Sequence, residues 1–165
     1  GRFITAKKQG RWEYVGRARG IKAAVILGVE EAADGRHGLL VDQYRVPLGR
    51  RCIELPAGPG GGQDEGEEAM LAASRELEEE TGYRPGRMEV LGEFFSSPGM
   101  VSESFTLFRA HDLVKTGEGG GVDGEDIRVH RVALAGIAEL IAAWRAEGFA
   151  IDVKLLLLLG AGIVG

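Results

Sequence analysis

Hydrophobic and polar positions along the chain follow patterns that predict several strands and two helices. Residues 21–29 (IKAAVILGV) form the most strongly apolar run, as expected of a buried strand. A polar turn with an Asp-Gly pair, at 33–38, separates this run from the next apolar stretch, 39–44. Two apolar runs joined by such a turn predict a β-hairpin.

The remaining elements complete a mixed fold. Helical periodicity over 67–81 is followed by Gly82, a residue typical of the position just after a helix, and 137–147 predicts a second, amphipathic helix. Further strands are expected at 51–55, 88–95, 104–110 and 127–134, with one or two edge strands within 3–15. Because strands and helices alternate irregularly, the order favours an α/β fold of the α+β type over a parallel doubly wound one. We expect a single domain over 1–165.

Composition narrows the classes of function. A net charge of −5 argues against a broad nucleic-acid surface, so a polyanionic ligand would need a local device such as a bound cation. The single cysteine, Cys52, lies in an apolar-alternating stretch and is interpreted as a packed strand thiol; one cysteine suits a reducing cytoplasm. No secretory signal is recognised, and the run 155–159 is too short to cross a membrane. We interpret that run as a buried helix or a subunit contact.

The predicted helix at 67–81 concentrates acidic side chains. Glu76, Glu79 and Glu80 follow i, i+3, i+4 spacing and share one sector of its surface. Like charges at this spacing repel by roughly 0.2–0.5 kcal/mol per pair, and the helix dipole adds to the cost near the C-terminus. A hard divalent cation would offset that cost. The alternative is a solvated acidic face without a ligand.

The full pattern around these residues is more specific. Gly61 is followed after five residues by Glu67, and after seven more by Arg75-Glu76-Leu77-Glu78-Glu79-Glu80-Thr81-Gly82-Tyr83. This segment resembles the Nudix box, G-x5-E-x7-R-E-U-x-E-E-x-G-U, at every fixed position. The resemblance implies a mixed β-sheet sandwiched between helices and hydrolysis of a nucleoside diphosphate derivative with two or more Mg²⁺ ions, Mn²⁺ being an alternative.

The resemblance also implies roles for individual residues. Glu76, Glu79 and Glu80 would be metal-facing carboxylates, with Glu79 and Glu80 counted as catalytic. Arg75 would orient Glu79 one helical turn away, and Glu67 would support the site from the start of the helix. Glu78 and Ser74 are expected to face solvent. No nucleophilic Ser, Cys or His motif is evident, which agrees with attack by water.

Segments outside the box resemble the ADP-ribose pyrophosphatase branch. Upstream, Gln43-Tyr44-Arg45 and Glu54-Leu55-Pro56-Ala57-Gly58 imply that Arg45 contacts the diphosphate and that the Ala57 carbonyl is a metal ligand. Downstream, Pro98 lies sixteen residues after Gly82, where that branch carries a marker proline, and Glu103 would hold the terminal ribose or its loop. An ordinary turn and a surface carboxylate are the alternative interpretations.

A second glycine-rich loop, 116–124, precedes one more candidate. In similar enzymes a carboxylate on this loop completes the site; Glu125 is the first choice and Asp123 the second, against a solvated acidic loop. Trp12 or Tyr14 would stack on adenine. This contact could also cross a homodimer interface, because the similar enzymes exchange N-terminal segments between subunits. For each aromatic a core or interface role is at least as well supported.

One departure concerns the loop 56–66. The family usually shares one glycine between E-x-P-A-G and the box, whereas here Gly58 and Gly61 are three positions apart. Either glycine could fill the structural role, so the geometry near Ala57 is open.

The sequence predicts a homodimeric, Mg²⁺-dependent ADP-ribose pyrophosphatase that gives AMP and ribose 5-phosphate. A Nudix enzyme for a nucleotide sugar, a dinucleoside polyphosphate, NADH or an oxidised nucleotide is the nearest alternative. A non-catalytic nucleotide sensor is the alternative from another class, although such domains typically lose box carboxylates. An RNA-processing enzyme is disfavoured by the acidic charge.

Overall fold

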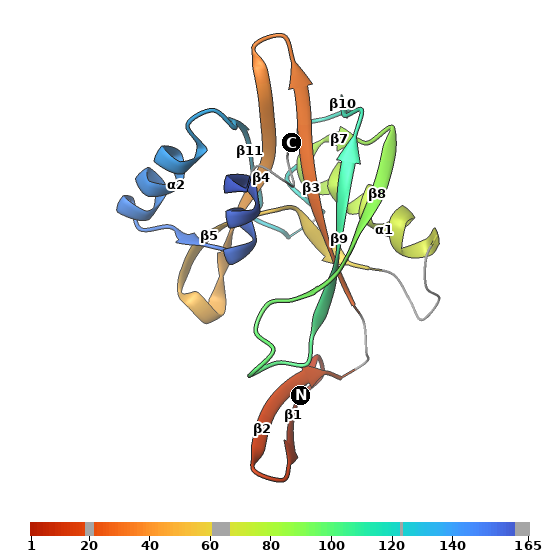
Figure 1. The fold of residues 1–165 in the computed structure, drawn as a ribbon, viewed down its shortest axis with the longest axis vertical. Helices are drawn as coiled ribbons and strands as arrows, with labels where there is room; N and C mark the ends of the chain where they lie inside the picture. The colour runs from red at the N-terminus through yellow and green to blue at the C-terminus, as the bar shows by residue number, and fades with distance from the viewer. Residues whose placement is uncertain (19–21, 61–66, 123, 161–165) are drawn as a thin grey trace.

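The computed structural model describes residues 1–18, 22–60, 67–122 and 124–160 (Figure 1). Its strands are β1 (Ile4–Gln9), β2 (Trp12–Arg17), β3 (Ala23–Ala32), β4 (Gly35–Arg45), β5 (Arg50–Glu54), β6 (Ala57–Pro59), β7 (Tyr83–Arg84), β8 (Arg87–Phe95), β9 (Ser104–His111), β10 (Val114–Lys115), β11 (Arg128–Ala133) and β12 (Ala150–Ile151). The α-helices are α1 (Glu67–Thr81) and α2 (Ile137–Ala146), and the 3₁₀ helices are η1 (Val46–Leu48) and η2 (Val153–Leu159).

The hairpin of β3 and β4 forms the spine of a mixed sheet with the order β12-β5-β4-β3-β9-β8. The two spine strands pair with each other only near their turn, from Val29↔Gly38 to Ala32↔Gly35. Farther from the turn they diverge, so that β3 pairs with β9 and the short β6, while β4 pairs with β5 and β11. The divergence opens the sheet at the end where β6 and β5 lie.

Two hydrophobic cores cover the opposite faces of β3. Ala24 and Ile26 belong to the core that also contains Ala73 and Leu77 of α1. The alternate positions, such as Val25 and Leu27, belong to a larger core that includes side chains of α2 and η2. A strand buried on both faces explains the continuous apolar run in the sequence. The expected sheet between helices is thus confirmed (Figure 1).

Most predicted elements lie within a few residues of their expected bounds, and the differences are local. The loop 56–66 contains β6, which pairs with β3 through backbone hydrogen bonds and carries no alternating apolar pattern. The C-terminal run forms the 3₁₀ helix η2, with Leu155 and Leu158 buried and Leu156 and Leu159 exposed. Cys52 is buried on β5, as the packed-thiol interpretation predicts, and burial raises the pKa of its thiol to about 12.

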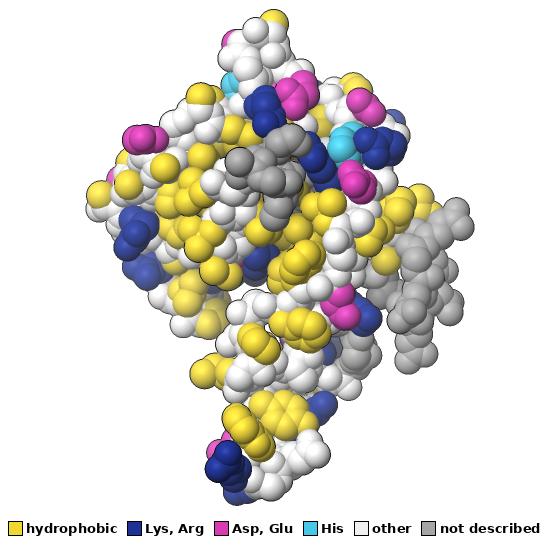
Figure 2. Space-filling model, in the orientation of Figure 1, with side chains coloured by type: hydrophobic (Ala, Val, Ile, Leu, Met, Phe, Trp, Pro, Cys, Tyr) yellow, Lys and Arg dark blue, Asp and Glu magenta, His cyan; other side chains and the backbone are white. Residues whose placement is uncertain are grey.

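The first two strands form a hairpin that extends from the lower end of the molecule in Figure 1. It contacts the loop between β8 and β9 through Val15, whose backbone N–H donates to Met100 O at 3.0 Å and whose carbonyl accepts from Ser102 N at 2.9 Å. Phe3, Ile4 and Trp12 are exposed on it. Hydrophobic side chains are visible over this hairpin in Figure 2. Among the described residues, no helix is long and apolar enough to cross a membrane.

Candidate active site

The carboxylates predicted to face a metal lie along the side of α1 that meets β6. Glu80 is buried at 5% exposure, whereas Glu76 and Glu79 are partly exposed. The neighbouring apolar positions Ala73 and Leu77 are fully buried against the sheet, which fixes the rotation of the helix. The acidic face therefore borders the core rather than pointing wholly into solvent.

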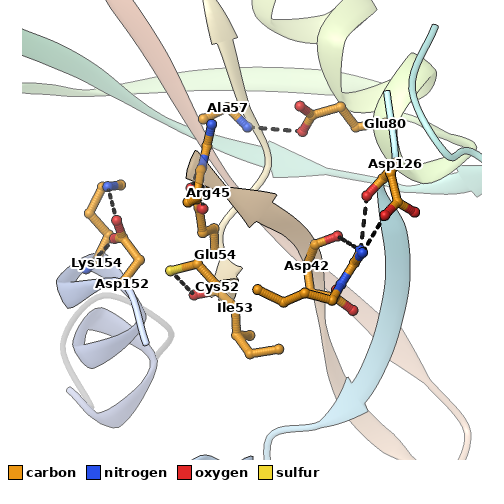
Figure 3. A network of polar contacts seen from close by, with 11 residues as sticks. Asp42, Arg45, Cys52, Ile53, Glu54, Ala57, Glu80, Asp126, Asp152 and Lys154 are labelled. Atoms are coloured by element: carbon orange, nitrogen blue, oxygen red, sulfur yellow. Dashed lines mark hydrogen bonds and ion pairs between the residues drawn. The ribbon is translucent and has the colours of Figure 1, made fainter. Parts of the chain in front are cut away.

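Glu80 contacts the backbone of β6. Its Oε2 accepts a hydrogen bond of 3.0 Å from the Ala57 N–H (Figure 3). β6 is held in turn by β3, where the Ile26 N–H donates to Pro56 O at 2.8 Å. Burial raises the pKa of Glu80 to about 8; the Ala57 hydrogen bond opposes this shift, and the charges of Glu76 and Glu125 add to it. A buried carboxyl held among other carboxyls is destabilised as an anion unless a cation is nearby.

Gly58 allows Glu76 to approach the same strand. A Cβ atom added at Gly58 would lie 2.4 Å from Cδ and Oε2 of Glu76, so any side chain there would displace the carboxylate. Burial also raises the pKa of Glu76, while Arg75 lowers it. Of the two glycines left open by the sequence, Gly58 makes this close approach, and Gly61 lies outside the described residues.

Arg75 bridges two carboxylates on the outer side of α1. Its Nη1 donates to Glu79 Oε2 and its Nη2 to Glu76 Oε1, each at 2.7 Å. The hydrogen bond to Glu79 is the main cause of a raised pKa for Arg75. The predicted contact between Arg75 and Glu79 is present, and the contact with Glu76 is an addition that helical spacing alone did not suggest.

Glu78 lies at the surface of α1 and forms several hydrogen bonds there. Its carboxylate accepts two hydrogen bonds from Arg84, at 2.8 and 2.9 Å, and one from Thr116 Oγ1 at 2.9 Å. Glu78 therefore lies at the surface, as expected, and in addition ties α1 to the start of the second glycine-rich loop. A signal for this contact is lacking in the sequence, because Thr116 is 38 residues away.

The second glycine-rich loop packs against the C-terminal end of α1. The N–H groups of Gly120 and Gly121 donate to the carbonyls of Glu80 and Glu79, at 2.8 and 3.0 Å. Gly119 has φ +70°, and an added Cβ would lie 2.5 Å from Glu80 O. These bonds satisfy carbonyls that a helix end leaves without partners. The loop thereby brings Glu125 close enough for its charge to raise the pKa of both Glu76 and Glu80.

The residues fit a hard cation, although their carboxylates are divided among other partners. Within the described part of the chain, no three His, Cys, Asp or Glu side chains are gathered in a metal-binding arrangement. Glu80 contacts β6, Glu76 and Glu79 share Arg75, and Glu125 accepts a hydrogen bond of 3.0 Å from the Val122 N–H. The fit rests on the kind of donor, since the carboxylates along this side of α1 and the backbone of β6 supply oxygen atoms, which hard divalent cations prefer. The side chain of Glu67 and all of Asp123 lie outside the described residues.

A cavity of about 640 Å³ opens beside β6 and is lined by Ala57 and Gly58. Its charged lining residues are Arg17, Lys22, Arg45, Glu54, Glu103, Asp152 and Lys154. Arg45 is oriented by Glu54, which accepts from its Nε at 2.6 Å and from its Nη2 at 2.7 Å. This two-point contact raises the pKa of Arg45, whose side chain is 40% exposed. The predicted residues Arg45 and Glu103 thus line one cavity.

The other predicted substrate residues are elsewhere. Trp12 and Pro98 line a smaller cavity of about 280 Å³ together with Tyr14, between the N-terminal hairpin and the loop after β8. Neither of them lines the cavity that contains Arg45. Glu103, although in the larger cavity, forms an ion pair of 2.6 Å with Arg17. The structure therefore divides the four predicted substrate residues between two places on one chain.

Sequence reasoning missed contributions from the C-terminal segment and from β9. Asp152, Lys154 and Phe105 all line the larger cavity. Lys154 Nζ binds Asp152 at 2.7 Å and lies 5.6 Å from the centroid of the Phe105 ring. Nothing in the local pattern marks these residues, since β12 brings Asp152 to the cavity by pairing with β5.

Comparison with known proteins agrees with this geometry. Residues 21–151 match the NUDIX domain, and the chain therefore belongs to that family. This match confirms the family that the box resembles, and divalent metal cations are the general cofactors of Nudix hydrolases.

Relatives carry several names. The chain is 41% identical over 88 residues to the methanol dehydrogenase activator of Bacillus methanolicus, covering 53% of this chain and 46% of that protein. It is 36% identical over 104 residues to the ADP-ribose pyrophosphatase of Bacillus subtilis, covering 62% and 55%. It is 32% identical over 150 residues to the GDP-mannose pyrophosphatase of Cronobacter sakazakii, covering 86% and 72%. The chain thus spans about half the length of the first two relatives.

A solved structure supports the fold. The crystal structure of an ADP compounds hydrolase superposes with a TM-score of 0.64 and 21% identity, over 94% of this chain and 89% of that one. At this identity the likeness concerns the architecture alone.

Proposed function

We propose that this protein is a Mg²⁺-dependent ADP-ribose pyrophosphatase that hydrolyses ADP-ribose to AMP and ribose 5-phosphate. The observation that carries the proposal is the position of Glu80, a buried carboxylate bonded to Ala57 at the edge of a cavity that contains Arg45. The carboxylates that would face the metal lie on one side of β6, and Arg45, which would contact the phosphates, lies in the cavity beside it. The Bacillus subtilis relative named ADP-ribose pyrophosphatase supports the choice of substrate.

The chain's own residues suit such a reaction. Arg45, held by Glu54 and partly exposed in the cavity, would bind the diphosphate, for which a planar fork is well matched. When bound, divalent cations supply neutralisation of the diphosphate charge and acidification of the attacking water. Glu76, Glu79 and Glu80 would hold them, with the Ala57 carbonyl as a further oxygen ligand.

Glu125 would take the proton of the attacking water. Water adds to one phosphorus, the bridging P–O bond breaks, and each product keeps one phosphate group. Glu125 lies on the loop fixed to the end of α1, and its charge influences both Glu76 and Glu80. A group this near the metal carboxylates can accept a proton at the reacting centre.

The cavity near Phe105 and Lys154 would receive the part of the substrate beyond the diphosphate. About 640 Å³ lies in the range of sites for ligands of this size. Trp12 and Pro98 would approach a substrate only across a dimer interface, since on one chain they line another cavity. The exposed Phe3, Ile4 and Trp12 of the hairpin support a homodimer, which light scattering after size-exclusion chromatography would test.

A second candidate is hydrolysis of another nucleoside diphosphate sugar. The GDP-mannose pyrophosphatase aligns over 86% of this chain, a larger share than the ADP-ribose pyrophosphatase of Bacillus subtilis. The same carboxylates and the same arginine would serve both reactions, so the difference would reside in the cavity beyond Arg45.

The deciding experiment is a substrate panel with Mg²⁺, in which products are separated by chromatography. We expect selective cleavage of ADP-ribose to AMP and ribose 5-phosphate, abolished by EDTA and by Glu80→Gln. Cleavage of GDP-mannose in preference would keep the site and replace the substrate. Binding of the compounds by folded, metal-loaded protein without any turnover would favour the nucleotide-sensor interpretation.

A further inference from the structure

Arg51 connects the central sheet to the segment that follows Glu125. From β5, its Nη2 donates to the backbone carbonyl of Asp126 at 2.9 Å, and its Nη1 lies 2.5 Å from Asp126 Oδ2. The other side of the guanidinium contacts Asp42, through Nε to the carboxylate and through Nη2 to the carbonyl at 3.0 Å. One side chain thus joins a strand and a loop that are 75 residues apart in the chain.

Asp42, the residue that anchors Arg51 to the sheet, is itself held by contacts with other elements. The Asp42 side chain is 1% exposed, and its second oxygen lies 2.6 Å from His130 Nε2. Asp42 belongs to β4 and His130 to β11, which pair as neighbours in the sheet. His130 also packs edge-on against Trp144 of α2, with ring centroids 5.5 Å apart. Figure 3 shows Asp42 on the sheet and Asp126 on the loop, both joined by dashed lines to the guanidinium between them.

The loop is therefore fixed on both sides of Glu125. On the N-terminal side, Gly120 and Gly121 are bonded to the last turn of α1. On the C-terminal side, Asp126 is held by Arg51. The carboxylate of Glu125 lies between these anchors, where it accepts a hydrogen bond of 3.0 Å from the Val122 N–H and lies beside Gly121, the residue bonded to Glu79 O. Because Asp126 directly follows Glu125, a shift in one backbone is passed to the other.

We propose that Arg51 is a positioning residue that holds Glu125 over the acidic face of α1 by fixing the backbone of Asp126. This inference rests on the proposed role of Glu125 in hydrolysis. Arg51 does not line the 640 Å³ cavity, so it acts through the loop rather than on the substrate. Both contacts with Asp126 carry this positioning: the backbone carbonyl contact is the stronger, and the ion pair adds a smaller part because the Asp126 side chain is 71% exposed and water screens it.

These contacts need the planar guanidinium group of an arginine at position 51. Arg51 bonds two backbone carbonyls and two carboxylates at once, whereas a lysine ammonium would retain the charge but not this planar geometry. Arg50, the preceding residue on the same strand, is exposed and gives a matched control.

The test compares Arg51→Lys with Arg50→Lys on the panel compound that the wild-type enzyme cleaves fastest. We expect Arg51→Lys to lower kcat by about 10–100-fold, the range for lost supporting contacts, with KM changed less than about twofold. Arg50→Lys should match the wild type. In the absence of metal, amide hydrogen exchange of residues 120–122 and 124–126 should become faster in Arg51→Lys only.

A double variant separates positioning from general support of the fold. If Arg51 acts through Glu125, then Arg51→Lys should have little further effect on kcat in a Glu125→Gln background, since residues acting as a unit are not additive. Multiplicative losses would overturn the proposal. So would a wild-type kcat in Arg51→Lys when Glu125→Gln is impaired. Full activity of Glu125→Gln would instead overturn the proposed role of Glu125 itself.

Asp126→Ala provides a second, milder variant on an exposed residue. It removes the contact with Nη1 and retains the backbone carbonyl, so we expect a loss of about threefold in kcat that is absent in the Glu125→Gln background. If Arg51→Lys fails to fold, this variant decides the question. An unchanged kcat in Asp126→Ala would then overturn the proposal.

Discussion

The carboxylate of Glu80 accepts a hydrogen bond from the backbone N–H of Ala57, which lies 23 residues earlier in the chain. This bond joins the two segments on which the proposed site depends, the helix α1 and the short strand β6. It also places the buried Glu80 against β6, where Gly58 has no side chain and so leaves space for the carboxylate of Glu76. Each of these contacts can be tested by a separate variant.

Replacing Glu80 with Gln should lower kcat by roughly 10²–10³-fold, the scale of loss for a group that stabilises charge at the reacting centre. The amide keeps the shape and can still accept from the Ala57 N–H, so the fold should persist. Steady-state hydrolysis at saturating Mg²⁺ and circular dichroism measure the two effects. Glu139→Gln, on the exposed side of α2, is the matched control and should leave both unchanged. Wild-type turnover in Glu80→Gln would remove this residue from the site.

The metal-free protein should lose stability as pH rises from about 5 to 8. The folded-state pKa of Glu80 is about 8, above the ordinary value of 4.5, so over this range the folded state binds more protons than the unfolded state. Stability then falls with increasing pH, by at most about 5 kcal/mol. Denaturant unfolding in EDTA, at several pH values, measures this. In Glu80→Gln the slope should be smaller, and saturating Mg²⁺ should also reduce it; an equal slope in wild type and variant would contradict the assignment.

Gly58→Ala should weaken metal binding without unfolding the protein. The added Cβ would meet the Glu76 carboxyl at 2.4 Å and push it from β6, so we expect a 10–100-fold higher Mg²⁺ requirement. Activity measured against Mg²⁺ concentration gives the result. Gly160→Ala, whose Cβ would meet only Leu157 O at 3.5 Å, should behave as the wild type. An unaltered Mg²⁺ requirement in Gly58→Ala would show that Glu76 does not need this approach.

Gly119→Ala and Gly117→Ala form a matched pair within the second glycine-rich loop. Gly119 has φ +70° and no room for a Cβ beside Glu80 O, whereas a Cβ at Gly117 would meet nothing within 4 Å. We expect Gly119→Ala to cost about 1–3 kcal/mol of unfolding free energy and to reduce kcat, because the loop leaves the end of α1. Gly117→Ala should be close to neutral. Equal effects of the two variants, by thermal unfolding and turnover, would argue against the capping role.

Arg45→Lys should raise KM by about tenfold and change kcat less. Lysine keeps the charge but loses the two-point contact with Glu54, so the cation is no longer oriented toward the diphosphate. Initial rates across substrate concentrations separate the two constants. Arg87→Lys, an exposed arginine at the start of β8, serves as control. An unchanged KM would exclude Arg45 from substrate binding.

The chemistry of the acidic helix was readable from the sequence because it is local. Helical periodicity alone puts Glu76, Glu79 and Glu80 on one face and Arg75 one turn from Glu79, and the structure keeps those relationships. The fold class and most element bounds were predictable for the same reason, since burial on one or both faces leaves a period in the sequence.

Other features of the site depend on contacts between segments that are distant in the sequence, and only the tertiary structure shows them. Only pairing of β6 with β3 brings Ala57 to Glu80, and only pairing of β12 with β5 brings Asp152 and Lys154 to the cavity of Arg45. The link from Arg51 to Asp126, and the placing of Trp12 and Pro98 away from Arg45, have no local pattern either. The sequence by itself determined the acidic helix and, through the motif on that helix, the family of the protein, because both depend on residues close together in the chain. The cavity and the support of the loop were decided by long-range strand pairing, which no short window of residues encodes.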